Sequence, residues 1–162
     1  MRILILVTIV LFPLMAMTAP ADSLFYETGG GFLYSTGSTA NFLRYRHETT
    51  PLFGYSSYYE ASYASWNGPD HDNAVGLARG IRWAGTDDDG LTFTAGVSHI
   101  RRTTDNLGQP FEFYLRLAYE KNIGKALLSV GWIHYSDGKF IFGWSGPNDS
   151  ENFATVSVGM HF

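Results

Sequence analysis

A histidine and a serine lie two residues apart in the segment HYS, as His134 and Ser136. An imidazole can take the proton of a serine hydroxyl and so turn a weak nucleophile into one that attacks an ester carbonyl. On an extended strand, side chains two residues apart project from the same face, with Cα atoms about 6–7 Å apart. Because an imidazole nitrogen can reach a hydroxyl at that spacing, the pair could be the base and the nucleophile of a serine esterase.

Such a base also needs an acceptor for the hydrogen on its other nitrogen. The residues after Ser136 offer three carboxylates for this role: Asp137, Asp149 and Glu151. The oxyanion of an ester needs donors, which Asn148, Gly146 and the loop amides could supply. H-x-S occurs by chance in many proteins. Strand chemistry alone therefore favours the simpler interpretation, a histidine and a serine at the rim of a barrel.

The segment 124–136 has the alternation of a membrane-facing strand. The face that carries the pair begins with Ala126, Leu128, Val130 and Trp132. The other face carries Lys125, Leu127, Ser129, Gly131, Ile133 and Tyr135. Polar groups that end a lipid-facing stripe are costly, so a functional role is expected for them.

Alternating segments of this kind recur along the chain between clusters of turn residues. We count eight: 23–34, 39–48, 54–66, 72–84, 90–101, 110–121, 124–136 and 153–162. An even number of strands of about ten residues, without helical patterns, is typical of an outer-membrane barrel. The abundance of glycine (18), tyrosine (10) and phenylalanine (12), and the final Phe162 on an apolar face, fit this class. The fold predicted is all-β, an eight-stranded antiparallel up-and-down transmembrane β-barrel.

The inner face of this barrel should carry charges of both signs, which would have to pair in a narrow lumen. The charged residues assigned to it are Glu27, Arg44, Arg46, Glu112, Arg116 and Glu120, and Asn41 is placed with them. Segment 54–66 is aromatic on both faces and is left unassigned, and the outward Arg79 suggests a bulge or another register. Side chains fill an eight-stranded barrel, so chemistry must lie on its outer wall or rim. A soluble lipocalin-like barrel, with the two faces reversed, is the alternative.

Residues 1–21 have the pattern of a signal peptide, and residues 22–162 would be the outer-membrane β-barrel. The leader has Arg2, an apolar run and the cleavage pattern Ala19-Pro20-Ala21, and an uncleaved membrane anchor is the alternative. The net charge of −4 argues against nucleic acid as a partner. The absence of cysteine excludes disulfides, thiolate metal sites and lipoprotein anchoring. TDDDG at 86–90 lacks the spacing of a calcium loop, and the chemistry of a serine esterase requires no metal or cofactor.

The connections predict the orientation. Short turns are expected at 49–53, 86–90 and 121–125, and longer loops near 35–38, 67–71, 102–109 and 137–152. Bacterial barrels keep short turns in the periplasm and longer loops outside. Both termini would then be periplasmic, and the HYS segment would lie at the depth of the outer leaflet, where the lipid is lipopolysaccharide.

The C-terminal part of the chain resembles the lipid A 3-O-deacylase (PagL) family. The matching stretches are LGQPFEF (107–113), the strand that ends in HYS (134–136), and the PN…EN run at 147–152. The resemblance is best over residues 90–162. It implies a carboxylic-ester hydrolase of the bacterial outer membrane that removes the 3-linked acyl chain of lipid A, without a cofactor.

The resemblance also implies roles for individual residues. His134 would be the base, Ser136 the nucleophile, Glu151 the acid of the triad, and Asn148 would stabilise the oxyanion. The chain departs from the family in having Asp137 where asparagine usually follows the serine. It also has a longer loop before the last strand, which makes Asp149 the alternate acid.

Two other functions remain open at this point. One is a non-enzymatic barrel for adhesion or membrane integrity, in which the HYS segment would be dispensable. The other is a different lipid A enzyme, such as an acyltransferase. The sequence also leaves open whether the chain forms a homodimer.

Overall fold

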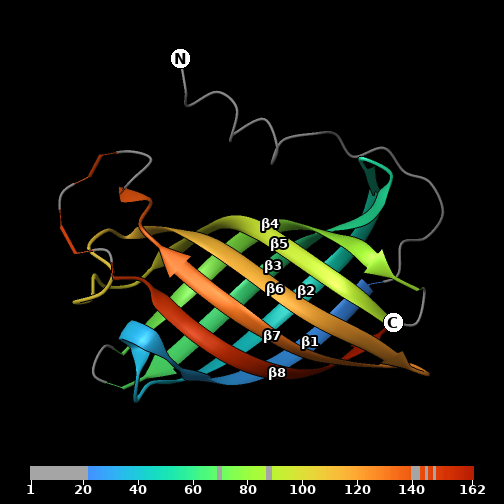
Figure 1. Cartoon of the computed structure of the whole chain (residues 1–162), viewed down its shortest axis with the longest axis horizontal. Coiled ribbons are helices and arrows are strands. Elements are labelled where there is room, and N and C mark those ends of the chain that lie inside the picture. The colour runs from blue at the N-terminus through green and yellow to red at the C-terminus, as the bar shows by residue number, and fades with distance from the viewer. Residues whose placement is uncertain (1–21, 69–70, 87–88, 140–142, 145, 148) are drawn as a thin grey trace.

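The computed structural model describes residues 22–68, 71–86, 89–139, 143–144, 146–147 and 149–162. Eight antiparallel strands close into a barrel in chain order, as predicted (Figure 1). They are β1 (Asp22–Gly31), β2 (Thr39–Leu52), β3 (Tyr55–Asn67), β4 (Asp72–Gly85), β5 (Asp89–Ile100), β6 (Phe111–Ile123), β7 (Ala126–Ser136) and β8 (Glu151–His161). In the described part of the chain, no helix is long and apolar enough to cross a bilayer. The predictions for residues 1–21 and for Asn148 fall outside the described residues.

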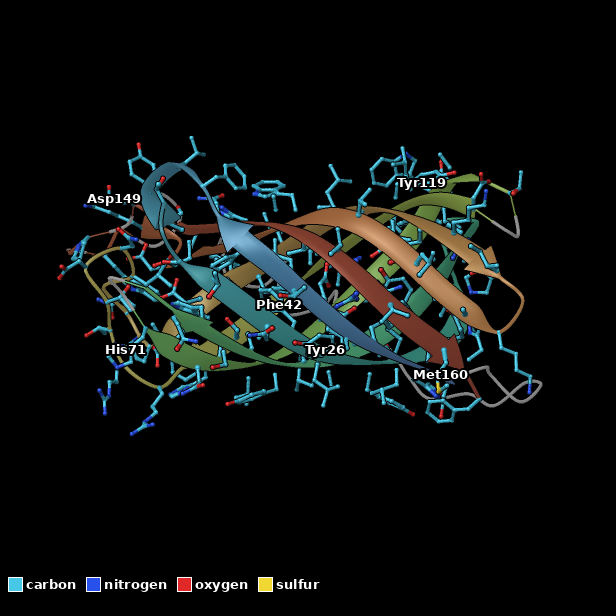
Figure 2. All side chains as sticks on the ribbon, turned by 90° about the horizontal axis from the view of Figure 1, so that it is seen from below. Tyr26, Phe42, His71, Tyr119, Asp149 and Met160 are labelled. Carbon is cyan, nitrogen blue, oxygen red and sulfur yellow. The ribbon has the colours of Figure 1, made fainter. Side chains whose placement is uncertain are left out.

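The strands point apolar side chains outward and polar ones inward. On β6, for example, Phe111 and Tyr119 are exposed, whereas Glu112, Arg116 and Glu120 are buried. Figure 2 shows the same division, with Tyr119 on the outside of the wall and Phe42 inside it. This arrangement is the one expected for a barrel in lipid, and it excludes the reversed faces of a lipocalin-like barrel.

Two strand ends differ from the predicted ones by three or more residues, and the others differ by at most two. β1 stops at Gly31, and the chain enters a short 3-10 turn, η1 (Leu33–Ser35), where the alternation had suggested three more strand residues. β2 continues to Leu52 and meets β3 through a two-residue turn at Phe53 and Gly54, both with positive φ. The turn was predicted at 49–53, but a register shift between Thr49 and Leu52 accommodates Pro51 within the strand.

The outer wall also carries two polar residues that the alternation treated differently. Asn41 was wrongly placed inside, because it shares the outward phase of Leu43, and its Oδ1 accepts a hydrogen bond from Tyr26 Oη (2.7 Å). Arg79 faces outward, as its position in the sequence suggested. Its guanidinium lies over the ring of Tyr59, 5.2 Å from the centroid, and the bulge of β4 comes after it, between Arg82 and Ala84.

The middle of the lumen is filled by a network of paired charges. Its members are Glu27, Arg44, Arg46, Glu60, Arg116 and Glu120, all buried. Arg44 contacts Glu27 (2.6 Å) and Glu60 (2.8 Å), while Arg46 joins Glu60 (2.9 Å) to Glu120 (2.8 Å). The predicted pairing is therefore confirmed for Glu27, Arg44, Arg46, Arg116 and Glu120. Glu112 was predicted with them, but it is buried without an ion pair among the described residues. Glu60 was missed because both faces of β3 are aromatic.

An aromatic cluster fills the lumen next to this network, on the side of the longer loops. Trp66 packs against Tyr135 and Phe153, with ring centroids 5.5 and 5.9 Å apart, and Phe42 packs edge-on against Phe153. Together with the charged network, the side chains of this cluster fill the interior of the barrel. Any ligand as large as a lipid must therefore meet the protein on the outer wall.

The two ends of the barrel differ as predicted. The tight connections β2–β3, β4–β5 and β6–β7 lie at one end, and the longer connections, including the one between β7 and β8, lie at the other (Figure 1). Both Asp22 and Phe162 are at the end with the tight turns, where the Phe162 N–H donates to the Asp22 carbonyl (3.0 Å). We call these the turn end and the loop end.

Candidate active site

The end of β7 presents His134 and Ser136 on the outer wall, as the alternation predicts. The residues between and before them, Tyr135 and Ile133, are buried in the aromatic cluster at 1% and 0% exposure. These two inward anchors fix the facing of the strand, because successive side chains point to opposite sides. His134 lies opposite Leu115 of β6, and Ser136 lies opposite Phe113.

The Ser136 hydroxyl lies at the loop end of the barrel, in the last residue of β7. Its Oγ accepts a long hydrogen bond from the Gly138 N–H (3.4 Å). The side chain is half-buried, between an apolar wall and the start of the connection to β8.

The partner of His134 comes from β8. The β7–β8 register places Asn152 directly across from His134, and Nδ1 of the imidazole is 3.0 Å from Oδ1 of the amide. The same Oδ1 accepts a hydrogen bond from Nε1 of Trp132 (3.1 Å), and the indole lies beside the imidazole with centroids 5.4 Å apart. Three outward side chains from two strands thus form one hydrogen-bonded group.

Asn152 is itself held firmly. Its backbone N–H donates to Ser35 Oγ (2.8 Å), and its carbonyl accepts from the Phe32 N–H (3.1 Å). These bonds connect the start of β8 to η1, and the residue is only 4% exposed. The search for an acceptor among carboxylates missed Asn152. Counting back in steps of two along β8 from the outward Val156 places Asn152 on the outer face, and this would have identified it.

The carboxylate that the resemblance implies faces the other way. Glu151 is fully buried on the inner side of β8, across from Tyr135, and its Oε1 accepts from Asn106 Nδ2 (3.0 Å). It therefore ties the β5–β6 connection to β8. The geometry does not bring Glu151 to His134, because the period of the strand puts it in phase with the inward Phe153.

For the remaining candidates of the loop, the hydrogen bonds described are with partners other than His134. Asp149 is exposed, and its N–H donates to the Asn106 carbonyl (3.0 Å). Asp137 is buried, and its Oδ1 accepts from the Lys139 N–H (2.8 Å). The carbonyl of Gly146 accepts from Lys139 Nζ (2.7 Å). Among the described residues, no group of three His, Asp or Glu side chains could hold a metal ion.

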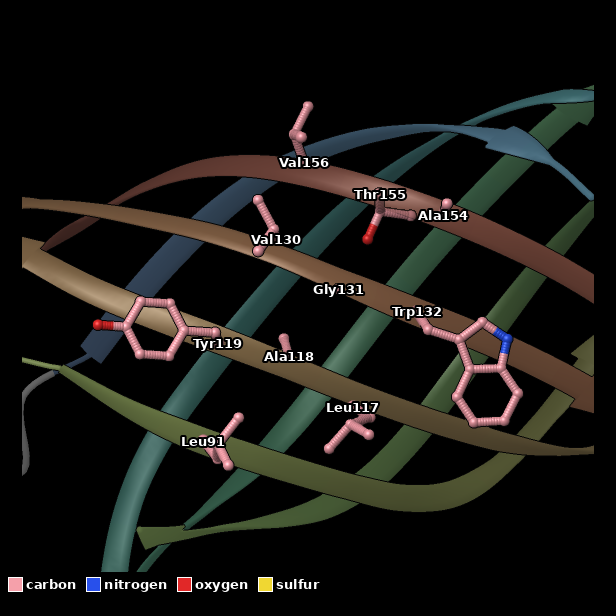
Figure 3. Close-up of a pocket in the computed structure, with 10 residues that line it drawn as sticks. All are labelled: Leu91, Leu117, Ala118, Tyr119, Val130, Gly131, Trp132, Ala154, Thr155 and Val156. Atoms are coloured by element: carbon pink, nitrogen blue, oxygen red, sulfur yellow. The ribbon is translucent and has the colours of Figure 1, made fainter. Parts of the chain in front are cut away.

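A shallow apolar groove of about 520 Å³ runs along the outer wall from Tyr119 to Trp132 (Figure 3). It is lined by Leu91, Leu117, Ala118, Tyr119, Val130, Gly131, Trp132, Ala154, Thr155 and Val156. Gly131 is an inward position beneath this groove, where a Cβ would lie 2.9 Å from Ala118 Cβ and from the Leu117 carbonyl oxygen. Trp132 stands between this groove and His134. The loop end of the groove therefore lies beside the hydrogen-bonded group of Trp132, His134 and Asn152, which we call the polar group.

An eight-stranded antiparallel barrel with an apolar outer wall and a polar, filled lumen belongs to the class of small outer-membrane β-barrels. The family model for lipid A 3-O-deacylase (PagL) matches residues 29–161. The chain therefore belongs to the lipid A 3-O-deacylase family, whose members are outer-membrane ester hydrolases that act on lipid A. Its location is the bacterial outer membrane.

Solved structures agree on the fold. The crystal structure of the outer-membrane enzyme PagL matches with a TM-score of 0.61 and 20% identity, over 85% of this chain and 98% of that one. A de novo designed transmembrane β-barrel gives 0.63 and 11%, over 91% and 100%. The Yersinia pestis outer-membrane protein Ail gives 0.56 and 10%, over 88% and 99%. No curated protein sequence matches the chain.

Proposed function

We propose that this protein hydrolyses the 3-linked acyl ester of lipid A within the outer leaflet, with Ser136 as nucleophile and His134 as general base. Membership of the family supports the reaction, and the outward facing of both side chains supports the two roles. The observation that carries the proposal is their position on the lipid-facing wall of a barrel whose lumen is filled.

In this reaction Oγ of Ser136 attacks the ester carbonyl while Nε2 of His134 takes its proton. The tetrahedral intermediate then loses the sugar oxygen, which receives that proton from His134. Water, activated by the same imidazole, cleaves the acyl-serine and releases the fatty acid. Asn148 and amides of the connection after Ser136 would donate hydrogen bonds to the oxyanion, a role that rests on the family resemblance.

The apolar groove would receive the acyl chain that is to be removed. A chain that moves there from the bilayer gains no hydrophobic free energy, because lipid is as apolar as the wall. The groove therefore contributes packing and orientation. With Trp132 at its loop end, two positions before His134 on the same face, it would direct the ester toward the polar group.

A comparison of serine variants in purified protein tests the proposal. With lipid A in mixed micelles, we expect the wild type to release one acyl chain, seen as a loss of mass in lipid A spectra, and Ser136→Ala to release none. Ser65→Ala is the matched control, because Ser65 is also a half-buried residue of the outer wall, near the loop end of β3. Undiminished deacylation by Ser136→Ala would refute the proposal.

A further inference from the structure

The amide of Asn152 meets two ring nitrogens with a single atom. Its Oδ1 lies 3.1 Å from Nε1 of Trp132 and 3.0 Å from Nδ1 of His134. The oxygen and nitrogen of an amide are normally told apart by their partners. An indole N–H is only a donor, so the atom that faces it has to be the amide oxygen. Trp132 thus determines which way round the Asn152 amide lies.

This orientation determines the tautomer of His134. An amide oxygen can only accept, so Nδ1 of the imidazole must carry the hydrogen in the bond to Asn152. In a neutral imidazole the other nitrogen, Nε2, is then an acceptor. A histidine with a lone pair on Nε2 is in the form that can take the proton of a serine hydroxyl.

The surroundings explain why a neutral residue suits this position. On the outer face of β6, the residues opposite His134 and Ser136 are Leu115 and Phe113. On the outer face of β8, Asn152 is followed by Ala154. None of these neighbours is charged. The acidic groups of the adjoining strand ends are all buried: Glu112 of β6, Asp137 after β7 and Glu151 of β8. A carboxylate on a wall that faces lipid would carry a high desolvation cost, which an amide avoids.

We propose that Asn152, oriented by Trp132, is the positioning residue of this site, so that the nucleophile, base and orienting group are serine, histidine and asparagine. The proposal rests on the function proposed above for Ser136 and His134. It replaces the carboxylate that the family resemblance implies with a neutral acceptor. Such an acceptor selects the tautomer of the base but adds no negative charge to stabilise the imidazolium.

The tautomer can be measured without any enzymatic activity. In Ser136→Ala protein labelled with ¹⁵N-histidine, we expect the nitrogen shifts of His134 in its neutral form to report hydrogen on Nδ1. Adding Asn152→Leu should give a mixture of tautomers or the Nε2–H form. Predominant Nε2–H in protein that retains Asn152 would overturn the proposal.

Kinetics on otherwise native protein give the second test. Asn152→Leu should lower kcat by about 10²- to 10⁴-fold with little change in KM, because a misoriented base fails in the chemical step. The backbone bonds of residue 152 to Ser35 and Phe32 do not depend on its side chain, so the fold should persist. Asn41→Leu is the matched control, since Asn41 is a hydrogen-bonded amide on the outer wall of β2, and its kcat should not change.

Two conservative variants separate orientation from structure. Asn152→Asp retains an acceptor and should keep activity, but its charge favours the imidazolium, so the acid limb of the kcat–pH profile should move to higher pH. Trp132→Phe frees the amide to turn over and should lower kcat about tenfold, roughly the loss of one hydrogen bond.

Wild-type kcat and pH profile in Asn152→Leu, with Ser136→Ala inactive, would refute this proposal alone. An active Ser136→Ala would instead refute the proposed function. The tautomer measurement would then decide whether Asn152 orients His134.

Discussion

The lumen and the rim of the outer wall both keep polar side chains away from bulk water, but they do so in opposite ways. In the lumen, ionised side chains of opposite charge pair with one another. Arg46, for example, contacts Glu60 at 2.9 Å and Glu120 at 2.8 Å. On the wall, the polar group of Trp132, Asn152 and His134 joins an indole, an amide and an imidazole. The network in the lumen is surrounded by protein, whereas the group on the wall has one side toward lipid.

The comparison shows where this fold can place charge. A buried ion is tolerated when opposite charges and hydrogen bonds surround it, which the interior of the barrel provides from all sides. A strand facing hydrocarbon has neighbours only along the wall, so neutral donors and acceptors carry the smaller desolvation cost there. We infer that the structural and the catalytic polar groups are segregated by the two faces of the same strands.

The largest effect that would test this segregation is the loss of the base. His134→Ala should lower kcat by about 10²- to 10⁴-fold, the usual contribution of a general base, while the free energy of unfolding stays nearly unchanged. The control is His99→Ala, because His99 is also an outward histidine near the loop end of its strand and packs on Phe111. Rates of acyl release and urea unfolding in lipid vesicles measure the two quantities. A marked loss of stability in His134→Ala would show that the two regions are not separate.

The next largest effect should come from the lumen. Glu60→Leu leaves Arg44 and Arg46 without a shared carboxylate and should reduce the free energy of unfolding by about 3–5 kcal/mol. Folded protein should still deacylate lipid A at nearly the wild-type rate. Glu48→Leu, at a half-buried position near the turn end of β2, provides the comparison and should cost much less. Equal losses in the two variants would argue against a network centred on Glu60.

A smaller effect is expected in the groove. Ala154→Leu places a larger side chain opposite Trp132 and should reduce the rate on long acyl chains about tenfold, within the range for a few methylenes in an apolar site. Short acyl chains should be affected less. Ala61→Leu makes the same change on the outward face of β3 and should leave the rates alone. Acyl-release kinetics with substrates of different chain length measure the effect, and a uniform loss would show that the groove does not receive the acyl chain.

The smallest effect concerns an arginine on the outer wall. Arg79→Gln loses the stacking on Tyr59 and a hydrogen bond to Ser57 (3.3 Å), and should cost about 0.5–1 kcal/mol of stability. Arg44→Gln, the same change in the lumen, should cost several times more. Urea unfolding of both variants sharpens the contrast. A cost for Arg79→Gln as large as that for Arg44→Gln would contradict it.

The sequence predicts the wall of this barrel well, because its strands alternate with a period of two. The outward Phe111 and Tyr119, the inward Arg116 and the facing of His134 all follow from that period. The prediction fails where both phases look alike, as around Glu60 in the aromatic β3. There, only the closed barrel shows which side is inside.

The third member of the candidate site shows the same limit. Glu151 and Asn152 are adjacent, so a choice between them is a choice of face, and a shift of one residue exchanges the two. The connection before them has no periodicity to set the phase, and a carboxylate is the more familiar partner for histidine. The register opposite His134 favours the amide.

The decisive measurement is the mass spectrum of lipid A from bacteria that make this protein, compared with bacteria that make Ser136→Ala. We expect lipid A that is lighter by the single 3-linked acyl chain with the wild type, and unmodified lipid A with the variant. Unmodified lipid A in both strains would contradict the proposed hydrolysis, and lipid A that gains mass would identify an acyltransferase instead.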